Sequence, residues 1–200
     1  MLFAMPLLPT DMTFSDKKSA RAYLRQKRSA LTKEYLKQAS DSLCGAIIAL
    51  DEFKNSDTIL LFYPLGNEPD LLKVMDSATR LGKKVAFPIS FPETSTLEFH
   101  EVASLSKMSV GTYGIAEPPA DAPIPPLTKN TLCIVPALAV DRRGYRIGYG
   151  KGYYDRFLAC FDGISLCAVF DGFLCRSLPT EATDIPLDIL ITETGVIRKQ

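Results

Sequence analysis

The sequence has very little histidine: His100 is the only one, and there is no tryptophan. A Ser-His-Asp triad needs histidine as its general base, and zinc sites rely on histidine or clustered cysteine. The five cysteines include no C-x-x-C pair, and most lie in apolar runs such as TLCIVPALAV. We therefore expect reduced, buried cysteines in a cytoplasmic protein, without a disulfide framework or a zinc site.

The sequence also lacks an excess of charge and a long hydrophobic run. Lys plus Arg and Asp plus Glu both number 23, so no overall field attracts nucleic acid or an acidic membrane surface. The start, MLFAMPLLPTDM, is too short to span a bilayer and lacks the basic region of a secretory signal. We predict that residues 1–14 are a disordered or mis-assigned extension, with Met12 as a candidate initiator, and that residues 15–200 form one catalytic domain.

Residues 15–50 have the periodicity of helices. Apolar side chains recur near a 3.6-residue spacing, with Ser15 as the expected N-cap and a break at Thr32 that begins a second helix. The first helix carries a basic stripe, made of Lys17, Lys18, Arg21, Arg25, Lys27 and Arg28. From spacing alone, a solvated helix face and a binding surface explain this stripe equally well.

After these helices, strands and helices alternate. Short apolar runs at 58–63 and 83–88 predict two strands, which flank a helix over 69–82. Pro69 is expected near the first turn of that helix, and Gly82 at its end. A strand-helix-strand order predicts parallel pairing through a right-handed crossover.

The remaining segments continue the alternation. The sequence predicts an edge strand at 96–102, a proline-rich irregular loop at 111–126, buried strands at 131–140 and 165–170, a helix start at 152–161, and a closing strand and turn at 188–198. This pattern defines the α/β class. We expect a three-layer α-β-α single domain with a mostly parallel central sheet and N-terminal helices.

Glycine is concentrated in one segment, DRRGYRIGYGKGYYDRF, residues 141–157. It holds four of the twelve glycines, Gly144, Gly148, Gly150 and Gly152. The segment follows an expected buried strand and precedes an expected helix, which is where open α/β sheets bind ligands. Glycines allow backbone N–H groups to approach an anion closely. The segment is therefore a candidate phosphate-binding loop.

The charges in this loop point to the same chemistry. Arg146 and Lys151 supply positive charge, but Gly152 stands where a Walker A loop needs Ser or Thr to hold magnesium. Asp155 could supply the missing magnesium ligand, because hard cations prefer carboxylate oxygen beside phosphate. A tight glycine-rich turn with solvated charges is the competing interpretation.

Three motifs resemble one enzyme family. The run R-x-G-x-G-x-G-Y-Y-D, from Arg146 to Asp155, resembles the signature of 5-formyltetrahydrofolate cyclo-ligases, also called methenyltetrahydrofolate synthetases. The helix KKSARAYLRQKR resembles the family's K-x-x-x-R element, and FYPLGNEPDLL resembles its folate-side segment. The family order, ending in D-x-P-x-D, is followed from about residue 15 to 194. The sequence departs from the family at Ala20, often Leu, and at Thr183, often His before Asp184.

The resemblance implies a reaction. ATP drives cyclisation of 5-formyltetrahydrofolate to 5,10-methenyltetrahydrofolate, with release of ADP and phosphate. The formyl oxygen is a poor leaving group, so it is phosphorylated before N10 of the folate attacks the same carbon. Phosphoryl transfer needs mainly positioning and neutralisation of charge, which Arg, Lys, Gly and Asp supply without His.

The resemblance also assigns residues. The nucleotide positions are Lys17, Lys18, Arg21, Arg146, Gly148, Tyr149, Gly150, Lys151, Gly152, Tyr153 and Tyr154. The folate positions are Tyr63, Glu68, Tyr149, Gly150, Lys151, Gly152 and Tyr153. Arg146 and Lys151 are the expected catalytic residues. Asp155 and Asp184 are the expected Mg²⁺ ligands, with Asp188 as an alternative to Asp184.

Other interpretations remain open. Tyr153 or Tyr154 could simply pack in the core, and Glu68 could be an N-terminal helix charge. A non-catalytic or sugar-phosphate-binding protein would keep the glycine loop but have no use for Tyr63 and Glu68. An RNA-binding module is disfavoured, because the basic helix lacks interleaved aromatics and the net charge is zero. We expect small-molecule ligands, no nucleic acid or membrane partner, and a monomer.

Overall fold

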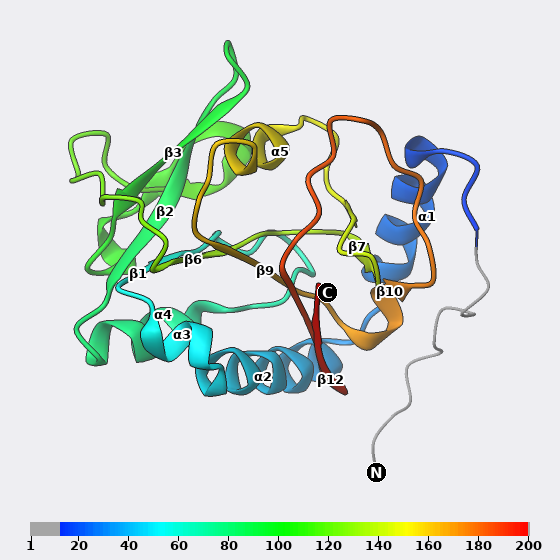
Figure 1. Ribbon diagram of the computed structural model, residues 1–200, viewed down its shortest axis with the longest axis horizontal. Coiled ribbons are helices and arrows are strands. Elements are labelled where there is room, and N and C mark those ends of the chain that lie inside the picture. Colours follow the sequence, from blue (N-terminus) through cyan, green and yellow to red (C-terminus); the bar gives the residue numbers. More distant parts are fainter. Residues whose placement is uncertain (1–12, 200) are drawn as a thin grey trace.

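In the computed structural model, which describes residues 13–199, seven strands pair into one central sheet (Figure 1). In spatial order these strands are β12 (Gly195–Arg198), β11 (Ile189–Thr192), β9 (Ile164–Ala168), β6 (Thr131–Ile134), β1 (Thr58–Leu60), β2 (Lys84–Phe91) and β3 (Thr96–Glu101). The five inner strands are parallel, and the edge strands β12 and β3 are antiparallel to their neighbours. The mostly parallel sheet and the edge strand over 96–102 are thus confirmed.

Helices cover both faces of this sheet. They are α1 (Lys17–Ser29), α2 (Lys33–Ala49), α3 (Asp51–Asn55), α4 (Leu72–Arg80) and α5 (Tyr153–Leu158). Figure 1 shows α2, α3 and α4 along one side of the sheet and α5 on the other. This arrangement confirms the α/β class with helices on both faces. No helix among residues 13–199 is long and apolar enough to cross a membrane.

Two small sheets and three short 3₁₀ turns complete the fold. The sheets are β10 (Leu174–Cys175) with β7 (Ala139–Asp141) and β8 (Arg146–Ile147), and β4 (Ser109–Val110) with β5 (Ala116–Glu117). The turns are η1 (Leu105–Lys107), η2 (Thr112–Gly114) and η3 (Asp171–Phe173). The segment 111–126, expected to be an irregular loop, therefore contains η2 and one strand of a short hairpin.

The prediction of one buried strand over 131–140 is wrong. The segment forms β6 and β7, which belong to different sheets. Pro136 lies between them and has no N–H to donate to a strand ladder, so regular pairing stops before it. After this break the chain forms β7, which pairs with β8 and leads into the glycine-rich loop.

Helix starts follow local capping rather than apolar spacing alone. Asp16, not Ser15, caps α1, because its Oδ1 accepts a hydrogen bond from the Ser19 N–H at 2.8 Å. Thr32 caps α2 as predicted, with its hydroxyl accepting from the Tyr35 N–H at 3.2 Å. The break between the first two helices is therefore confirmed at the predicted residue.

The third predicted helix begins later than expected. Pro69 precedes α4, which starts at Leu72, because Ser40 Oγ accepts from the Asp70 N–H and the Asp70 carboxylate accepts from the Leu72 N–H. Gly82 follows the helix with φ +72°, as expected for a residue that ends one.

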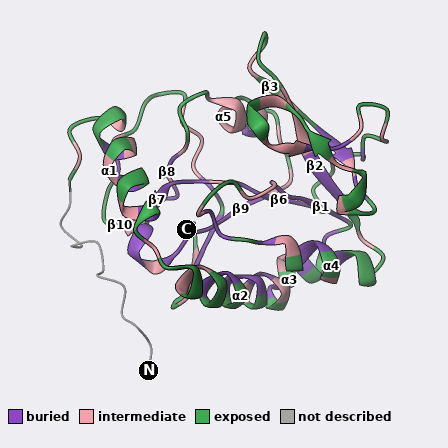
Figure 2. Ribbon diagram, turned by 180° about the vertical axis from the view of Figure 1, so that it is seen from behind, coloured by how far each residue is buried: buried purple, intermediate pink, exposed green. Residues whose placement is uncertain are grey.

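The core lies between the sheet and its helices (Figure 2). Four of the five cysteines are buried there as predicted, and all five are free thiols. Cys160 is exposed, which corrects the expectation for that residue. His100 is buried in β3, where its ring nitrogens lie 2.8 Å from the Ala122 carbonyl oxygen and from the Glu98 carboxylate. Its role is therefore structural.

Phe14 lies within the segment expected to be an extension. Its ring packs on Tyr23 of α1, with the ring centroids 5.9 Å apart. Residues 1–12 of that predicted extension fall outside the described residues.

Candidate active site

A cavity of about 780 Å³ opens at the carboxyl ends of β1 and β6. Nearly all of the predicted site residues line it, namely Lys17, Arg21, Tyr63, Glu68, Arg146, Gly148, Tyr149, Gly150, Lys151, Gly152, Tyr153, Tyr154, Asp155 and Asp184. Two residues do not line it: Lys18 is exposed on α1, and Asp188, the alternative metal ligand, instead accepts hydrogen bonds from the Ser165 N–H and hydroxyl at 2.8 and 2.7 Å. The fold thus gathers residues from four distant parts of the chain at the edge where parallel sheets bind ligands.

The glycine-rich loop needs glycine at two of its three central positions. Gly150 has φ +102° and Gly152 has φ +71°, conformations that strain residues with a Cβ. A Cβ on Gly150 would lie 3.2 Å from Arg21 Cζ, whereas a Cβ on Gly148 would meet nothing within 4 Å. If the loop is only a tight turn, alanine should be tolerated at Gly148 and strained at Gly150. If the loop also binds phosphate, alanine should weaken that binding at both positions.

Helix α5, which follows this loop, is shorter than predicted. It ends at Leu158 rather than extending to residue 161. The chain tightens there, since the Cys160 N–H donates to the Phe157 carbonyl and the Phe161 N–H to that of Leu158. A helix this short adds little dipole, so side-chain charges must provide most of the attraction for an anion.

The basic stripe of α1 faces the glycine-rich loop. Arg21 Nε donates to the Gly148 carbonyl at 3.0 Å, and Arg25 Nη2 lies 3.5 Å from the Tyr149 carbonyl. The Arg25 guanidinium also lies over the Tyr149 ring, 5.7 Å from its centroid. The solvated-face interpretation of the stripe is therefore wrong for Arg21, whereas Arg25 stays exposed while it contacts the loop.

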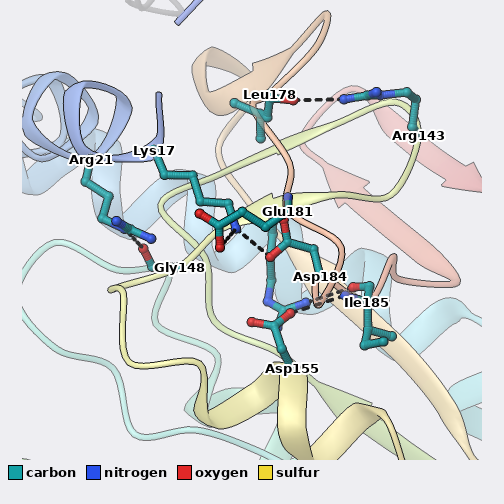
Figure 3. A network of polar contacts seen from close by, with 10 residues as sticks. Lys17, Arg21, Arg143, Gly148, Asp155, Leu178, Glu181, Asp184 and Ile185 are labelled. Atoms are coloured by element: carbon teal, nitrogen blue, oxygen red, sulfur yellow. Dashed lines mark hydrogen bonds and ion pairs between the residues drawn. The ribbon is translucent and has the colours of Figure 1, made fainter. Parts of the chain in front are cut away.

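Lys17 is held between two carboxylates (Figure 3). Its Nζ lies 2.5 Å from Asp184 Oδ1 and 3.2 Å from Glu181 Oε2. Asp184 Oδ2 accepts the Glu181 N–H at 2.7 Å, which fixes the carboxylate in this position. Lys17 and Asp184, predicted to bind phosphate and metal respectively, therefore neutralise each other in this structure.

Arg146 and Asp155 form a second pair of this kind. The Arg146 side chain is only 5% exposed, and its Nη2 lies 2.8 Å from Asp155 Oδ1. Its Nη1 donates to the Ile185 carbonyl at 3.1 Å, and the Ile185 N–H donates to Asp155 Oδ1 at 3.3 Å. The pairing compensates a buried guanidinium, and it brings Asp155 close to the segment that carries Asp184.

The acidic groups fit a shared magnesium ion better than a permanent metal cage. No cluster of three or more His, Cys, Asp or Glu side chains suited to a metal occurs within residues 13–199. Magnesium in phosphate sites usually takes one or two carboxylates and completes its shell with phosphate and water. Asp155 and Asp184 are two cavity carboxylates that could supply such ligands, and each is engaged in an ion pair in this structure.

A buried carboxylate also lines the cavity, next to the glycine-rich loop. Glu68 is 6% exposed, its Oε1 accepts from the Tyr149 hydroxyl at 2.5 Å, and its Oε2 accepts from the Leu65 N–H at 2.7 Å. Burial raises the pKa of Glu68, and these two hydrogen bonds oppose the rise. Tyr63 lies half-buried in the same wall. Glu68 lies before α4 and bonds to Tyr149, so it is more than a helix N-terminal charge.

The adjacent residues Tyr153 and Tyr154 lie in different surroundings. The Tyr153 hydroxyl lies 2.9 Å from that of Tyr113, and their rings meet edge to face with centroids 6.3 Å apart. Tyr154 packs its ring against Phe99, and its buried hydroxyl has no partner among the described side chains and backbone. Tyr154 therefore packs in the core, as one interpretation of the sequence held, and it also lines the cavity.

Sequence patterns missed several cavity residues, among them Glu181, Tyr113, Glu117 and Arg156. Tyr113 and the buried Glu117 lie in the proline-rich segment, where Glu117 accepts from the Ser90 and Thr112 N–H groups. Arg156 follows the glycine motif directly, and its Nη1 donates to the Lys151 carbonyl at 2.9 Å. Only Arg156, through its place beside Asp155, carried a sequence signal.

The fold and this cavity define an α/β enzyme whose candidate site combines a glycine-rich loop, basic side chains paired with carboxylates, and the buried Glu68. Residues 13–193 match the family model described as the 5-formyltetrahydrofolate cyclo-ligase family. The chain belongs to that family, as its motifs predicted, and is a ligase.

Relatives and solved structures agree with this assignment. The chain is 29% identical over 178 residues to 5-formyltetrahydrofolate cyclo-ligase of Escherichia coli K12, covering 86% of this chain and 98% of the relative. It is 28% identical over 195 residues to that of Mycolicibacterium smegmatis, covering 93% and 98%. The NMR structure of Aquifex aeolicus 5,10-methenyltetrahydrofolate synthetase matches with a TM-score of 0.80 and 30% identity, covering 92% of this chain and 93% of the other.

Proposed function

We propose that this ligase uses ATP and Mg²⁺ to cyclise 5-formyltetrahydrofolate to 5,10-methenyltetrahydrofolate, with release of ADP and phosphate. One observation carries the proposal: Tyr149 belongs to the glycine-rich loop, and its hydroxyl donates to Glu68, which comes from the distant segment between β1 and α4. The loop suited to phosphate and the carboxylate suited to a pterin are therefore in direct contact. This arrangement fits a reaction between two ligands in one cavity.

On the phosphate side, Lys17, Arg21 and the amides of the glycine-rich loop bind the triphosphate. Arg146 and Lys151 neutralise the charge of the transferred group. Asp155 and Asp184 would hold magnesium, which reduces the repulsion between phosphate oxygens when it is bound. Because Lys17 and Asp184 contact each other in this structure, binding must exchange that ion pair for contacts to the ligand.

On the folate side, Glu68 accepts hydrogen bonds from pterin N–H groups, and Tyr63 covers the ring. A carboxylate already fixed by two donors loses little freedom on binding. Tyr153 closes the wall between the two sides, where its hydroxyl contact with Tyr113 restrains the ring. The two ligands would then meet beside the glycine-rich loop.

The chemistry is a balanced group transfer. The formyl oxygen attacks the γ-phosphorus, and the bond from that phosphorus to the β–γ bridging oxygen breaks to release ADP. N10 then attacks the formyl carbon, the carbon–oxygen bond breaks, and phosphate leaves with the former formyl oxygen and the N10 proton is lost. The protein supplies alignment and charge neutralisation, which a site without histidine can provide.

The proposal also covers the location, oligomeric state and partners of the protein. We propose that the protein acts in the cytoplasm as a monomer, without a nucleic-acid or membrane partner. The sugar-phosphate or non-catalytic alternative is not favoured, because it has no use for the buried Glu68 beside Tyr149.

An absorbance assay of methenyltetrahydrofolate formation tests the proposal. Purified protein is mixed with 5-formyltetrahydrofolate, ATP and magnesium, and single omissions of ATP and of magnesium serve as controls. We expect product only in the complete mixture, with ADP and phosphate formed in equal amounts. Product without ATP, or no product in the complete mixture, would overturn the proposal.

A further inference from the structure

Glu117 is a buried carboxylate to which the proposed reaction gives no role. It ends β5 and is 8% exposed, and its Oε1 accepts a hydrogen bond from the Ser90 N–H of β2 at 3.1 Å. Its Oε2 accepts from the Thr112 N–H of η2 at 3.2 Å, and the Thr112 hydroxyl donates to the Ser90 carbonyl at 3.4 Å. A buried charge is costly unless it is hydrogen-bonded. Here that bonding ties the hairpin of β4 and β5 to the central sheet.

The backbone of the hairpin leaves room for this carboxylate at Gly111. A Cβ on Gly111 would overlap Glu117 Oε2. The φ of Gly111 is −110°, which other residues also adopt, so the backbone conformation alone does not call for glycine there. The position instead allows the Glu117 side chain to reach the Thr112 N–H.

The turn that Glu117 holds carries Tyr113. This residue follows Thr112 and has φ +60°, a left-handed conformation that is unfavourable for a residue with a Cβ. Such a conformation persists only where surrounding contacts impose it. The Tyr113 ring is half-exposed, lines the cavity, and meets Tyr153 through its hydroxyl. The contacts that hold the ring are therefore those of the turn and of Tyr153.

We propose that Glu117 is a positioning residue for Tyr113. Its carboxylate fixes the strained turn, and the turn sets the Tyr113 ring against Tyr153 in the cavity wall. The inference rests on the proposed function, in which Tyr153 closes the wall between the two ligands. Both carboxylate oxygens of Glu117 accept backbone N–H groups, so Glu117 acts through Tyr113.

The side chains around this turn favour an effect on the folate. Ile115 belongs to the same hairpin, and Leu97 is paired with Ser90 between β3 and β2. Ile115 and Leu97 both line the cavity and carry no charge, so this wall suits a ring rather than a triphosphate. A ring that is already held loses less freedom when a ligand binds. Loss of Glu117 should therefore weaken binding of 5-formyltetrahydrofolate more than binding of ATP.

The absence of tryptophan from the chain provides a direct probe of the turn. Tyr113→Trp places a single indole there, and its fluorescence anisotropy and quenching by acrylamide report how firmly the ring is held. Adding Glu117→Ala should lower the anisotropy and increase the quenching. Gly111→Ala should do the same, because its Cβ displaces the carboxylate. Val110→Ala is the matched control, since Val110 is exposed in the same hairpin and does not line the cavity.

Kinetics with tyrosine at 113 link the turn to binding. In Glu117→Ala the KM for 5-formyltetrahydrofolate should rise about two- to tenfold, as expected when one side chain must be immobilised on binding, and the KM for ATP should stay within about twofold of the native value. In a Tyr113→Gly background, Glu117→Ala should add nothing to the folate KM, because the ring that it positions is absent. Glycine also accepts the left-handed conformation, so the background keeps the turn.

Unchanged anisotropy in Glu117→Ala, or an equal rise in the folate KM with and without the Tyr113 ring, would overturn the inference. So would failure of Glu117→Ala, Glu117→Gln and Gly111→Ala all to fold, since Glu117 would then serve the fold alone. A native protein that forms no methenyltetrahydrofolate would instead contradict the proposed function. The fluorescence measurement needs no activity and would still decide whether Glu117 positions residue 113.

Discussion

The two sides of the cavity hold their charges in different ways. On the phosphate side, Lys17 and Arg146 are paired with Asp184 and Asp155, groups that would themselves be needed by magnesium. On the folate side, Glu68 is buried and fixed by neutral donors. Ion pairs can be exchanged for a charged ligand, whereas a fixed acceptor is ready for a neutral ring. If the proposed ligands bind there, Lys17 and Arg146 must exchange their ion pairs for contacts to phosphate, whereas Glu68 is already held in place.

Asp155→Asn should have the largest effect, because it removes charge from the side that must rearrange. We expect kcat to fall on the order of 100-fold, the loss typical when one group that stabilises a transition state is removed. The variant should also be less stable, because the buried Arg146 loses its anionic partner. We expect the free energy of unfolding to fall by about 1 to 3 kcal/mol.

Turnover of Asp155→Asn is measured against magnesium concentration, with thermal unfolding in parallel. Asp184→Asn, on the other carboxylate, serves as the matched variant. Native turnover at limiting magnesium would contradict a metal role for Asp155.

A pair of glycine variants tests the loop. A Cβ on Gly148 meets open space, so Gly148→Ala should change stability by less than about 0.5 kcal/mol. A Cβ on Gly150 is strained by φ +102°, so Gly150→Ala should cost about 1 to 2 kcal/mol. If the loop wraps phosphate, both variants should lose ATP affinity.

Thermal shift with and without magnesium-ATP measures this loss. The native protein should gain stability from the ligand, and Gly148→Ala should gain little, despite its intact fold. Equal stabilisation of the native protein and Gly148→Ala would support a plain structural turn.

Glu68→Gln tests the side that is already organised. Replacing a charged acceptor by a neutral amide should weaken 5-formyltetrahydrofolate binding by about 1 to 3 kcal/mol and leave ATP binding unchanged. Titration calorimetry with each ligand measures both affinities. Equal folate affinity of the native and variant proteins would remove Glu68 from the site.

Arg21→Ala should have the smallest of these effects and should be confined to the phosphate side. The ATP KM should rise about tenfold before the folate KM changes, as expected for the loss of one charge-assisted contact. Lys18→Ala is the matched control, because Lys18 lies on the same helix but outside the cavity. A change in folate KM with Arg21→Ala, or a similar ATP effect with Lys18→Ala, would contradict this placement of α1.

Much of the fold and most of the charged and glycine residues that line the cavity could be predicted, because both depend on local patterns. Apolar periodicity identified the parallel sheet, and the glycine motif identified residues that the cavity gathers. Contacts between distant segments were not predictable: nothing near Tyr149 in the sequence points to Glu68, and Tyr113 lay in a segment without a regular pattern. The break at Pro136 was missed because apolar composition alone does not distinguish one strand from two.

The central claim is that both sides of the cavity serve one group transfer from ATP to the formyl oxygen. It is tested most directly with 5-formyltetrahydrofolate whose formyl oxygen carries the heavy oxygen isotope. Mass spectrometry of the released phosphate then follows that oxygen. We predict one labelled oxygen in each phosphate formed. Labelled water with unlabelled phosphate would contradict the claim, because the formyl oxygen would then leave without accepting the phosphoryl group.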